Sequence, residues 1–269
     1  MKNETNFNGE FYIERPHLSY LDYHKVQPVG DIKTQALMKS GKTMGIFYIE
    51  SPATRQLLAK SRLVDFEHVV IYSSIIRPAA NKYINIMLER IHGRPWSLIH
   101  PDLSFLNESY GIMVYEEQVS MAVMTMTNFG YAKAELLRKT ISRNENKKDI
   151  QDWKEKFNNS SIKRGYKRHI IKEVWGMITS FIGYSFCKPH SASYAMLSFT
   201  CAYLKAHYPA EYMAAVLSNN MNDIKQVTFF MEECRRMGLT VLGPDVNESF
   251  YKFTVNDNQA IRFGMGAIK

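Results

Sequence analysis

The sequence predicts a mainly α-helical chain with a small β-containing extension at its C-terminal end. Apolar residues recur at steps of three and four through most of the chain, which is the spacing of one face of an α-helix. Glycine and proline residues interrupt this spacing and divide the helical segments. Only the last thirty residues alternate apolar and polar side chains as a strand does. With 269 residues and 45% hydrophobic content, the chain has the size of one large or two small globular domains.

The beginning of the chain is its least regular part. Residues 1–30 are polar and aromatic with little periodicity, and we interpret them as a tail that leads into the fold. The apolar run 43–49 predicts a short buried strand or extended segment. Ser51 and Pro52 then predict a helix start, with Ser51 as the N-cap and Pro52 at the first helical position.

Helices are predicted to follow one another from residue 66 to residue 181. The spacing favours helices over residues 66–76 and 80–91, and the first ends before Pro78 because proline disfavours helical geometry in the residue that precedes it. Residues 96–107 are expected to form a loop. The next amphipathic helix is marked by Tyr115, Val119, Ala122 and Met126. Further helices are predicted over residues 132–142, from about residue 150, and over 166–181, with a connection at 158–165.

The clearest helix of the sequence covers residues 193–207, where apolar side chains recur at steps of three and four. Pro209 kinks or restarts it before residues 211–217, and a further helix over residues 223–237 is closed by Gly238. Residues 240–242 are expected to be extended. Residues 250–255 and 260–264 flank the turn residues 256–258, and this pattern predicts a β-hairpin.

Positive charge is concentrated in one segment. The chain carries 34 Lys and Arg against 26 Asp and Glu, a net charge of +8. Residues 133–172 contain thirteen basic and five acidic residues, so this segment carries the whole excess, and the remainder balances at 21 of each. Such a local excess favours a surface for a polyanion such as a phosphate backbone. A solvated face without a partner is the alternative.

Three simple features exclude several protein classes. The cysteines Cys187, Cys201 and Cys234 are widely spaced, predict neither a zinc site nor a disulfide framework, and suit a reducing cytoplasm. No apolar run approaches the roughly 18 residues that a membrane helix needs. The first sixteen residues lack the basic flank and apolar stretch of a secretory signal. We therefore expect a cytoplasmic protein without a membrane partner.

A short segment between two predicted helices concentrates polar side chains. Lys188, His190, Ser191 and Ser193 lie within six residues and immediately precede a predicted helix N-terminus. Backbone N–H groups at a helix N-terminus, together with a lysine, make a natural phosphate site. An N-cap serine beside a structural histidine accounts for the same residues equally well.

Several segments, in the same order, resemble one protein family. The sequence GYSFCKPHSASYAMLSFTCAYLKAHYPAEYMAAVLS at 183–218 is similar to the fingers region of the bacterial family C DNA polymerases, the DNA polymerase III alpha subunits. GIFYIES at 45–51 resembles their GVFQLES, IRP at 76–78 their RPGP, YGIMVYEEQV at 110–119 their YGIIVYQEQV, and ELLRK at 135–139 their DLLRRAM. PDVN at 244–247 and FGMGAIK at 263–269 resemble the stretch that leads into their helix-hairpin-helix domain. The resemblance is collinear from about residue 20 onward and is closest to the divergent, error-prone-type alpha subunits.

The resemblance implies a multi-helix polymerase fingers domain over residues 31–218. Residues 1–30 are then an N-terminal tail or the end of a palm domain, and residues 219–269 a helix plus β-hairpin leading into a helix-hairpin-helix domain that is absent from the sequence. The implied function is part of a DNA-directed DNA polymerase, binding the incoming dNTP and template-primer DNA in replication or translesion synthesis. The implied partners are template-primer DNA, dNTPs, and the palm and other domains, encoded together with this chain or separately. The sliding clamp and replisome are reached through regions outside this sequence.

The resemblance also implies roles for individual residues. The residues expected to bind dNTP are Arg138, Lys139, Lys188, His190 and Ser191. The residues expected to bind DNA, from the matched motifs and the basic segment, are Arg77, Arg143, Lys147, Lys163, Lys167 and Arg168. Guanidinium forks and positive charge suit triphosphate oxygens. The structural alternatives are a helix-end salt bridge for Arg77 and solvated helix charges for Glu116 and Glu117.

The sequence departs from the family pattern at some of these positions. Ala79 and Ala80 replace a Gly-Pro, and Lys139 replaces the second arginine of a pair. Cys187 and Pro189 stand where Asn and Ser are usual. Because lysine is a point charge and arginine a planar fork, these changes alter the expected nucleotide contacts.

No catalytic or metal-binding residue is expected in this chain. Polymerase chemistry needs two metal ions held by carboxylates, and the family supplies them from an Asp-x-Asp pair and a third Asp of the palm. The nine aspartates here are scattered and form no such pair. We therefore expect Mg²⁺ to bind the complete polymerase and not this fingers segment, which alone would not synthesise DNA. The alternative is a DNA-binding module or an inactive remnant without catalysis of its own.

Overall fold

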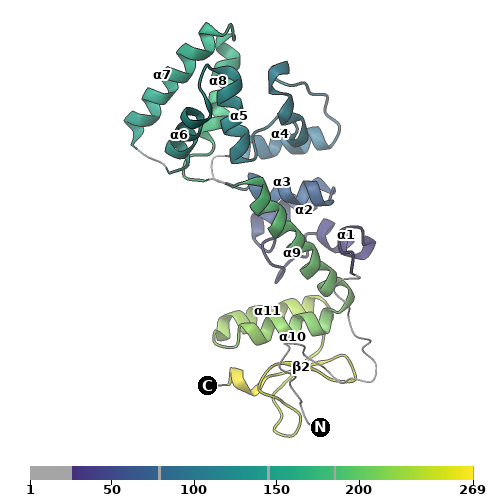
Figure 1. Ribbon diagram of the computed structural model, residues 1–269. Coiled ribbons are helices and arrows are strands. Elements are labelled where there is room, and N and C mark those ends of the chain that lie inside the picture. The colour runs from purple at the N-terminus through teal and green to yellow at the C-terminus, as the bar shows by residue number, and fades with distance from the viewer. Residues whose placement is uncertain (1–25, 78–79, 144–145, 185, 269) are drawn as a thin grey trace.

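The computed structural model describes residues 26–77, 80–143, 146–184 and 186–268. Figure 1 shows an elongated, mainly helical molecule. Helices α4 to α8 lie at one end, α1 to α3 lie beside α9 in the middle, and α10, α11 and a small sheet lie at the other end. The mainly α fold and the small β extension predicted from the sequence are confirmed.

Acidic or hydroxyl side chains cap the first three helices. These helices are α1 (Ile32–Lys39), α2 (Pro52–Ser61) and α3 (Phe66–Ile75). The side chains of Asp31, Ser51 and Asp65 each accept a backbone N–H of the following first turn, so Ser51 is the N-cap that the sequence predicts. Helix α1 was not predicted, because its buried face holds only Thr34 and Met38.

The apolar run 43–49 forms successive turns, and the predicted strand is wrong. Ile46 and Ile49 are fully buried, as the composition suggests. Gly45 and Tyr48, however, have φ angles of 75° and 68°, which lie in the left-handed region and interrupt an extended backbone. The apolar run therefore predicted the burial of this segment correctly but not its backbone conformation.

The predicted helices between residues 80 and 181 are present, with two differences. They are α4 (Asn81–Ile91), α5 (Glu116–Met126), α6 (Tyr131–Ser142), α7 (Lys147–Lys163) and α8 (Arg168–Thr179). The predicted loop 96–107 contains most of the 3-10 helix η2 (Pro101–Ser109), which buries Leu103 and Leu106. The predicted connection 158–165 begins only after α7 ends at Lys163, because Ser161 continues the buried face of that helix.

Helix α9 (Lys188–His207) begins five residues earlier than predicted. Its N-cap is Cys187, with proline in the first turn, so neither Ser191 nor Ser193 is the N-cap. Helix α10 (Pro209–Asn219) restarts at Pro209, and α11 (Ile224–Arg236) follows. Both agree with the sequence-based prediction.

The C-terminal extension contains a three-stranded sheet. Strands β2 (Thr254–Val255) and β3 (Ile261–Arg262) pair antiparallel, as the predicted hairpin requires. Strand β1 (Val241–Leu242) pairs parallel with β3, giving the order β1-β3-β2. A short 3-10 helix, η3 (Met265–Ala267), follows the sheet.

Two hydrophobic clusters form the interior. The larger includes residues of α1 to α9, and the smaller joins α10 and α11 to the sheet. Lys205 of α9 links the two regions: its ammonium lies 3.0 Å from the Glu233 carboxylate of α11 and 2.7 Å from the carbonyl oxygen of Met44. Within the described ranges, no helix is both long and apolar enough to cross a membrane.

Candidate nucleotide and DNA interface

The N-terminus of α9 is fixed against the N-terminus of α5. The backbone N–H of Glu116 donates to the carbonyl oxygen of Phe186 at 3.1 Å. The backbone N–H of Lys188 lies 3.3 Å from each carboxylate oxygen of Glu117. As the first helical residue of α9, Lys188 has no acceptor for this N–H within its own helix, so Glu117 supplies one. These bonds hold the segment that the sequence singled out for phosphate binding.

Arg138 of α6 lies between two carboxylates beside this junction. Its Nη1 is 2.5 Å from Glu116, and its Nε and Nη2 are each 3.0 Å from Glu135. Hydrogen bonding to Glu135 raises the pKa of the Arg138 guanidinium, and the same bonds lower the pKa of Glu135. Burial raises the pKa of Glu116, although Arg138 opposes that shift. The fork is therefore oriented and largely compensated, and a triphosphate would have to displace these carboxylates.

The other residues expected to bind dNTP have different surroundings. Lys139 is exposed beside Arg138. The Lys188 ammonium lies 2.6 Å from Glu108 and also faces the ring of Tyr115. His190 is exposed on the first turns of α9.

Ser191 is fully buried, and its hydroxyl hydrogen-bonds that of Ser74 in α3 at 2.7 Å. This position argues against a direct contact of Ser191 with dNTP. The serine instead joins α9 to α3, although it directly follows the exposed His190 in the same helix. The sequence could not separate these two neighbours, because both lie in the same short motif.

Arg77 is a second residue whose position argues against its sequence-based assignment. Its side chain lies in the interior, with only 4% of the residue exposed. The guanidinium donates to the carbonyl oxygens of Ser180, Met113 and Val114 at 3.0, 3.0 and 3.3 Å and stacks on the ring of Phe181. Burial lowers its pKa to about 10, so it stays charged at neutral pH. Arg77 therefore satisfies buried carbonyls instead of facing DNA, and its partners are not the carboxylate of a helix-end salt bridge.

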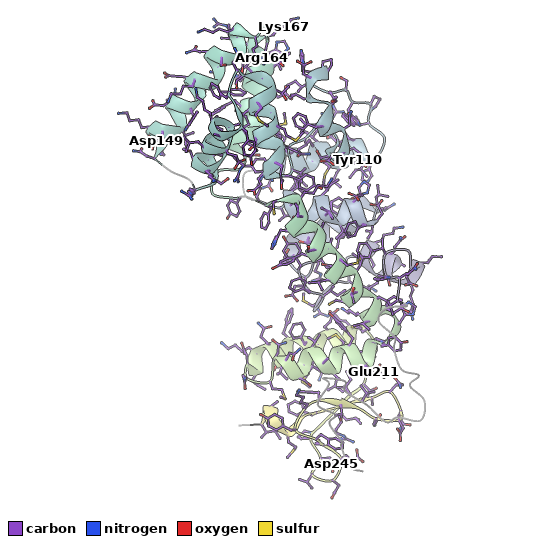
Figure 2. All side chains as sticks on the ribbon, viewed as in Figure 1. Tyr110, Asp149, Arg164, Lys167, Glu211 and Asp245 are labelled. Carbon is purple, nitrogen blue, oxygen red and sulfur yellow. The ribbon has the colours of Figure 1, made fainter. Side chains whose placement is uncertain are left out.

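The remaining residues expected to bind DNA are all exposed. These are Arg143, Lys147, Lys163, Lys167 and Arg168. They gather at the two ends of α7, whose 17 residues span about 25 Å. Figure 2 shows Arg164 and Lys167 at one end of this helix and Asp149 near the other. These five residues therefore form two groups and not one compact patch, with the exposed Lys154 and Lys156 of α7 between them.

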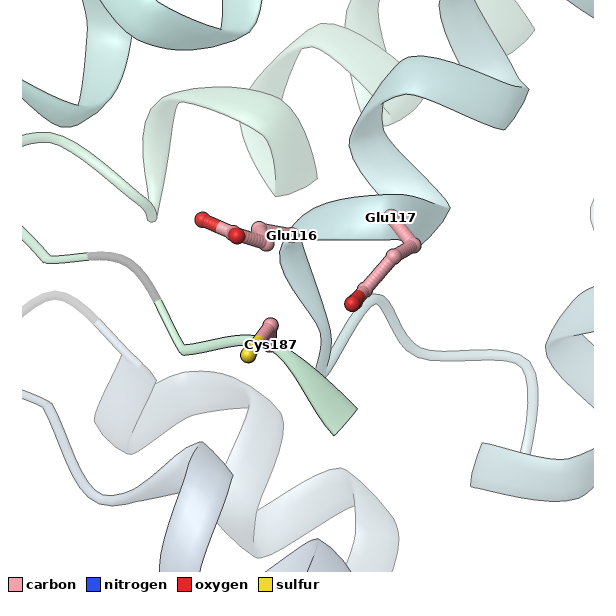
Figure 3. A group of neighbouring side chains, drawn as sticks. All are labelled: Glu116, Glu117 and Cys187. Carbon is pink, nitrogen blue, oxygen red and sulfur yellow. The ribbon is translucent and has the colours of Figure 1, made fainter. Parts of the chain in front are cut away.

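Glu116, Glu117 and Cys187 are the one group of possible metal ligands found among the described residues. Their ligand atoms all lie within 4.8 Å of one another (Figure 3). Both carboxylates already have partners, because Arg138 contacts Glu116 and the Lys188 N–H contacts Glu117. Mg²⁺ prefers oxygen ligands in a nearly octahedral arrangement, which a thiol does not suit. We assign this group to fixing the helix ends and assign no metal to it.

Sequence reasoning missed the acidic partners of this site. Glu135 precedes Arg138 by three residues on one helix, a spacing at which side chains meet, so that pair was available from the sequence. Glu116 and Glu108 come from other elements and gave no local signal. A solvated helix charge, the alternative favoured for at least one of Glu116 and Glu117, fits the exposed Glu117 but not Glu116, whose side chain is 22% exposed and pairs with Arg138.

The comparison with known families decides the identity of the fold. The family described as bacterial DNA polymerase III alpha subunit finger domain matches residues 13–165, more than half of the chain. The chain belongs to this family. A helix-hairpin-helix motif also matches residues 238–269 of this fingers chain. That motif therefore reaches into the C-terminal extension, which we expected only to precede it.

Three relatives of this chain are each described as DNA polymerase III subunit alpha. DNA polymerase III subunit alpha of Aquifex aeolicus is 36% identical over 247 residues, that of Neisseria meningitidis serogroup A 34% over 243, and that of Escherichia coli K12 31% over 252. Each alignment covers 90% of this chain and 21 or 22% of the relative. The fingers chain thus spans about a fifth of the length of these relatives.

Proposed function

We propose that this chain supplies the fingers function of a DNA-directed DNA polymerase, holding the incoming dNTP and template-primer DNA. Membership of the fingers family over more than half of the chain carries this proposal. The metal-binding carboxylates and Mg²⁺ then belong to a palm outside these residues. Work in replication or translesion synthesis, an error-prone character and a cytoplasmic location are further parts of the proposal.

The surroundings of Arg138 support a triphosphate site. The guanidinium is oriented by Glu116 and Glu135 and lies beside the exposed Lys139. A tetra-anionic triphosphate can replace two carboxylates as the partner of an arginine fork, because phosphoryl oxygens accept the same bidentate hydrogen bonds. In this proposal Lys139 and His190 contact the nucleotide directly, and Lys188 does so after leaving Glu108.

The two basic ends of α7 support a duplex contact. Their separation of about 25 Å corresponds to roughly seven base-pair steps of a duplex. Two groups of cations at that spacing can bind phosphates along one side of the DNA without reading its sequence. A DNA-binding module without catalysis is the second candidate, and the match to a helix-hairpin-helix motif favours it.

A salt titration tests the DNA surface. Binding of the chain to a primer-template duplex is measured over a series of salt concentrations for wild type and for Lys163→Ala/Lys167→Ala. We expect the slope of log K against log salt to shrink by about two, one for each lost phosphate contact. Lys33→Ala/Lys225→Ala, two exposed lysines elsewhere on the chain, is the matched control and should keep the wild-type slope. An unchanged slope in the first variant would contradict the proposed surface.

The same titration with a dideoxy-terminated primer tests the nucleotide site. Addition of the complementary dNTP should tighten wild-type binding. Lys139→Ala should reduce this gain by about tenfold, the effect of one charge-assisted hydrogen bond. Lys172→Ala is the control, because Lys172 is an exposed lysine of the same basic segment. The assignment of Lys139 would be contradicted if Lys139→Ala and Lys172→Ala reduced the dNTP-dependent gain in affinity equally, or if neither reduced it.

A further inference from the structure

A row of aromatic rings lies along one side of α9 and the turn segment 43–49. The ring centroids of Phe186 and His190 lie 6.2 Å apart, those of His190 and Tyr194 4.1 Å, and those of Tyr194 and Tyr48 4.8 Å. The ring of Phe47 lies 5.1 Å from that of Tyr194. We call these five residues the aromatic row. His190 and Tyr194 lie four residues apart on one side of α9, and Phe186 directly precedes the N-cap Cys187.

The aromatic row is not part of the hydrophobic interior. Helix α9 buries Ser191, Ala195 and Phe199 against the rest of the protein. His190 is exposed, 43% of Phe47 is exposed, and the other three rings are half-buried. Single exposed aromatic residues are common on proteins, but a contiguous set indicates a surface that binds a partner.

The turn that presents Phe47 and Tyr48 is held in place from several sides. Tyr48 has a φ of 68°, a left-handed conformation that is unfavourable for a bulky residue. The Ser198 hydroxyl donates to the carbonyl oxygen of Phe47 at 3.0 Å, and the Tyr212 hydroxyl donates to that of Gly45 at 2.7 Å. These hydrogen bonds stabilise the unfavourable backbone conformation of the turn, and this conformation places the rings of Phe47 and Tyr48 beside Tyr194.

The Tyr48 hydroxyl shows a further cost of placing this ring. Its oxygen is buried and has no hydrogen-bond partner among the described residues. Burial also raises the pKa of this hydroxyl, so it stays protonated. A buried hydroxyl without a partner is uncommon in proteins, so the placement of Tyr48 carries a cost that the surrounding structure bears.

We propose that the aromatic row is a stacking surface for unpaired bases of the template strand. Every base has a flat π face, so aromatic rings bind unpaired strands with little sequence preference. The row begins at Phe186, whose carbonyl oxygen accepts the N–H of Glu116 beside Arg138, and is therefore continuous with the proposed nucleotide site. The ring-centroid distances limit the span from Phe186 to Tyr194 to about 10 Å at most, the length of about three stacked bases. This inference rests on the proposed binding of DNA.

Two oligonucleotides separate stacking from charge. Fluorescence anisotropy of the full chain is measured with a labelled oligothymidylate of about 12 nucleotides and with an abasic strand of the same length. We expect wild type to prefer the thymidylate. Phe47→Leu and Tyr48→Leu should each weaken thymidylate binding by about five- to a hundredfold and leave abasic binding unchanged. Phe229→Leu is the matched control, because Phe229 is 42% exposed on α11 and lies outside the row.

Each other result has a definite meaning, once circular dichroism shows that the variants are folded. Equal binding of both strands by wild type, no binding of either, or an equal loss in Phe229→Leu overturns the inference. If both strands bind equally and Lys163→Ala/Lys167→Ala weakens them, the proposed DNA surface stands and the aromatic row does not. A thymidylate preference that depends on the row but not on these lysines supports the row against the basic surface. Displacement of thymidylate by a free dNTP would identify the incoming base, and not the template, as the occupant.

Discussion

Arg77 and Arg138 have opposite surroundings although both fall in motifs that the sequence connects with DNA synthesis. The Arg77 guanidinium lies in the interior and is bonded to carbonyl and hydroxyl oxygens. Arg138 is bonded to two carboxylates at the edge of the candidate site. Only Arg138 can exchange its partners for an anionic ligand, because phosphate oxygens compete with carboxylate oxygens for the same guanidinium fork. The burial of each arginine depends on contacts distant in sequence, so residue type and motif did not separate them.

Replacement of Arg77 tests its structural role. Arg77→Ala leaves the carbonyl oxygens of Met113, Val114 and Ser180 without their donor and opens a cavity beside Phe181. We expect the free energy of unfolding, measured by urea denaturation, to fall by about 3 kcal/mol. Arg235→Ala is the control: Arg235 is an exposed partner of Glu232 on α11, and its loss should change the free energy by less than about 1 kcal/mol. A stable Arg77→Ala chain with weakened DNA binding would restore the original assignment.

At the scale of elements, the sequence predicted most helices because their buried faces recur at 3.6-residue intervals, as in α7 and α8. The sequence-based prediction failed where a contact between distant segments determines the local conformation. The turns at 43–49 are held by Tyr212 and Lys205 from elements more than 150 positions later in the chain. The early start of α9 depends on Glu117 of α5 accepting the Lys188 N–H. The candidate site shows the same division, since cationic residue types were recognisable and their acidic partners on other helices were not.

Helix α9 connects the two regions of the molecule through Lys205. Lys205→Ala removes the buried partner of the Glu233 carboxylate, which is only 8% exposed, and leaves it with the exposed Arg236 at 3.4 Å. We expect a loss of about 3–5 kcal/mol in the free energy of unfolding, with faster hydrogen exchange in α10 and α11. Lys205→Met/Glu233→Met should recover part of this loss, since it removes both charges. Lys225→Ala, an exposed site on α11, should leave exchange unchanged; equal exchange in Lys205→Ala would contradict the linking role.

On the scale of the whole molecule, the candidate functions follow one line through the fold. Helix α7 lies at one end of the elongated molecule, α5 and α6 of the Arg138 site lie beside it, and α9 with the aromatic row leads from there toward the middle (Figure 1). Phosphate contacts, triphosphate contacts and base stacking are different interactions, and His190 alone is assigned to two of them. A polymer substrate that crosses several elements can use all three together, whereas a small ligand would need only one. The elongated arrangement therefore favours a nucleic-acid partner over an isolated small molecule.

The arrangement also predicts that the chain, assayed alone with Mg²⁺, a labelled primer-template and all four dNTPs, extends no primer. Two-metal catalysis needs carboxylates free to clamp both ions. The sequence has no Asp-x-Asp pair, and Glu116 and Glu117 are engaged by Arg138 and the Lys188 N–H. The decisive comparison is with Glu116→Gln/Glu117→Gln, using Glu108→Gln as the control. Primer extension by wild type that disappears only in the first variant would make this cluster a metal site and assign catalysis to the chain itself. Absence of extension, combined with dNTP-dependent binding of the primer-template, would instead place the chain in a polymerase whose catalytic carboxylates lie on another domain.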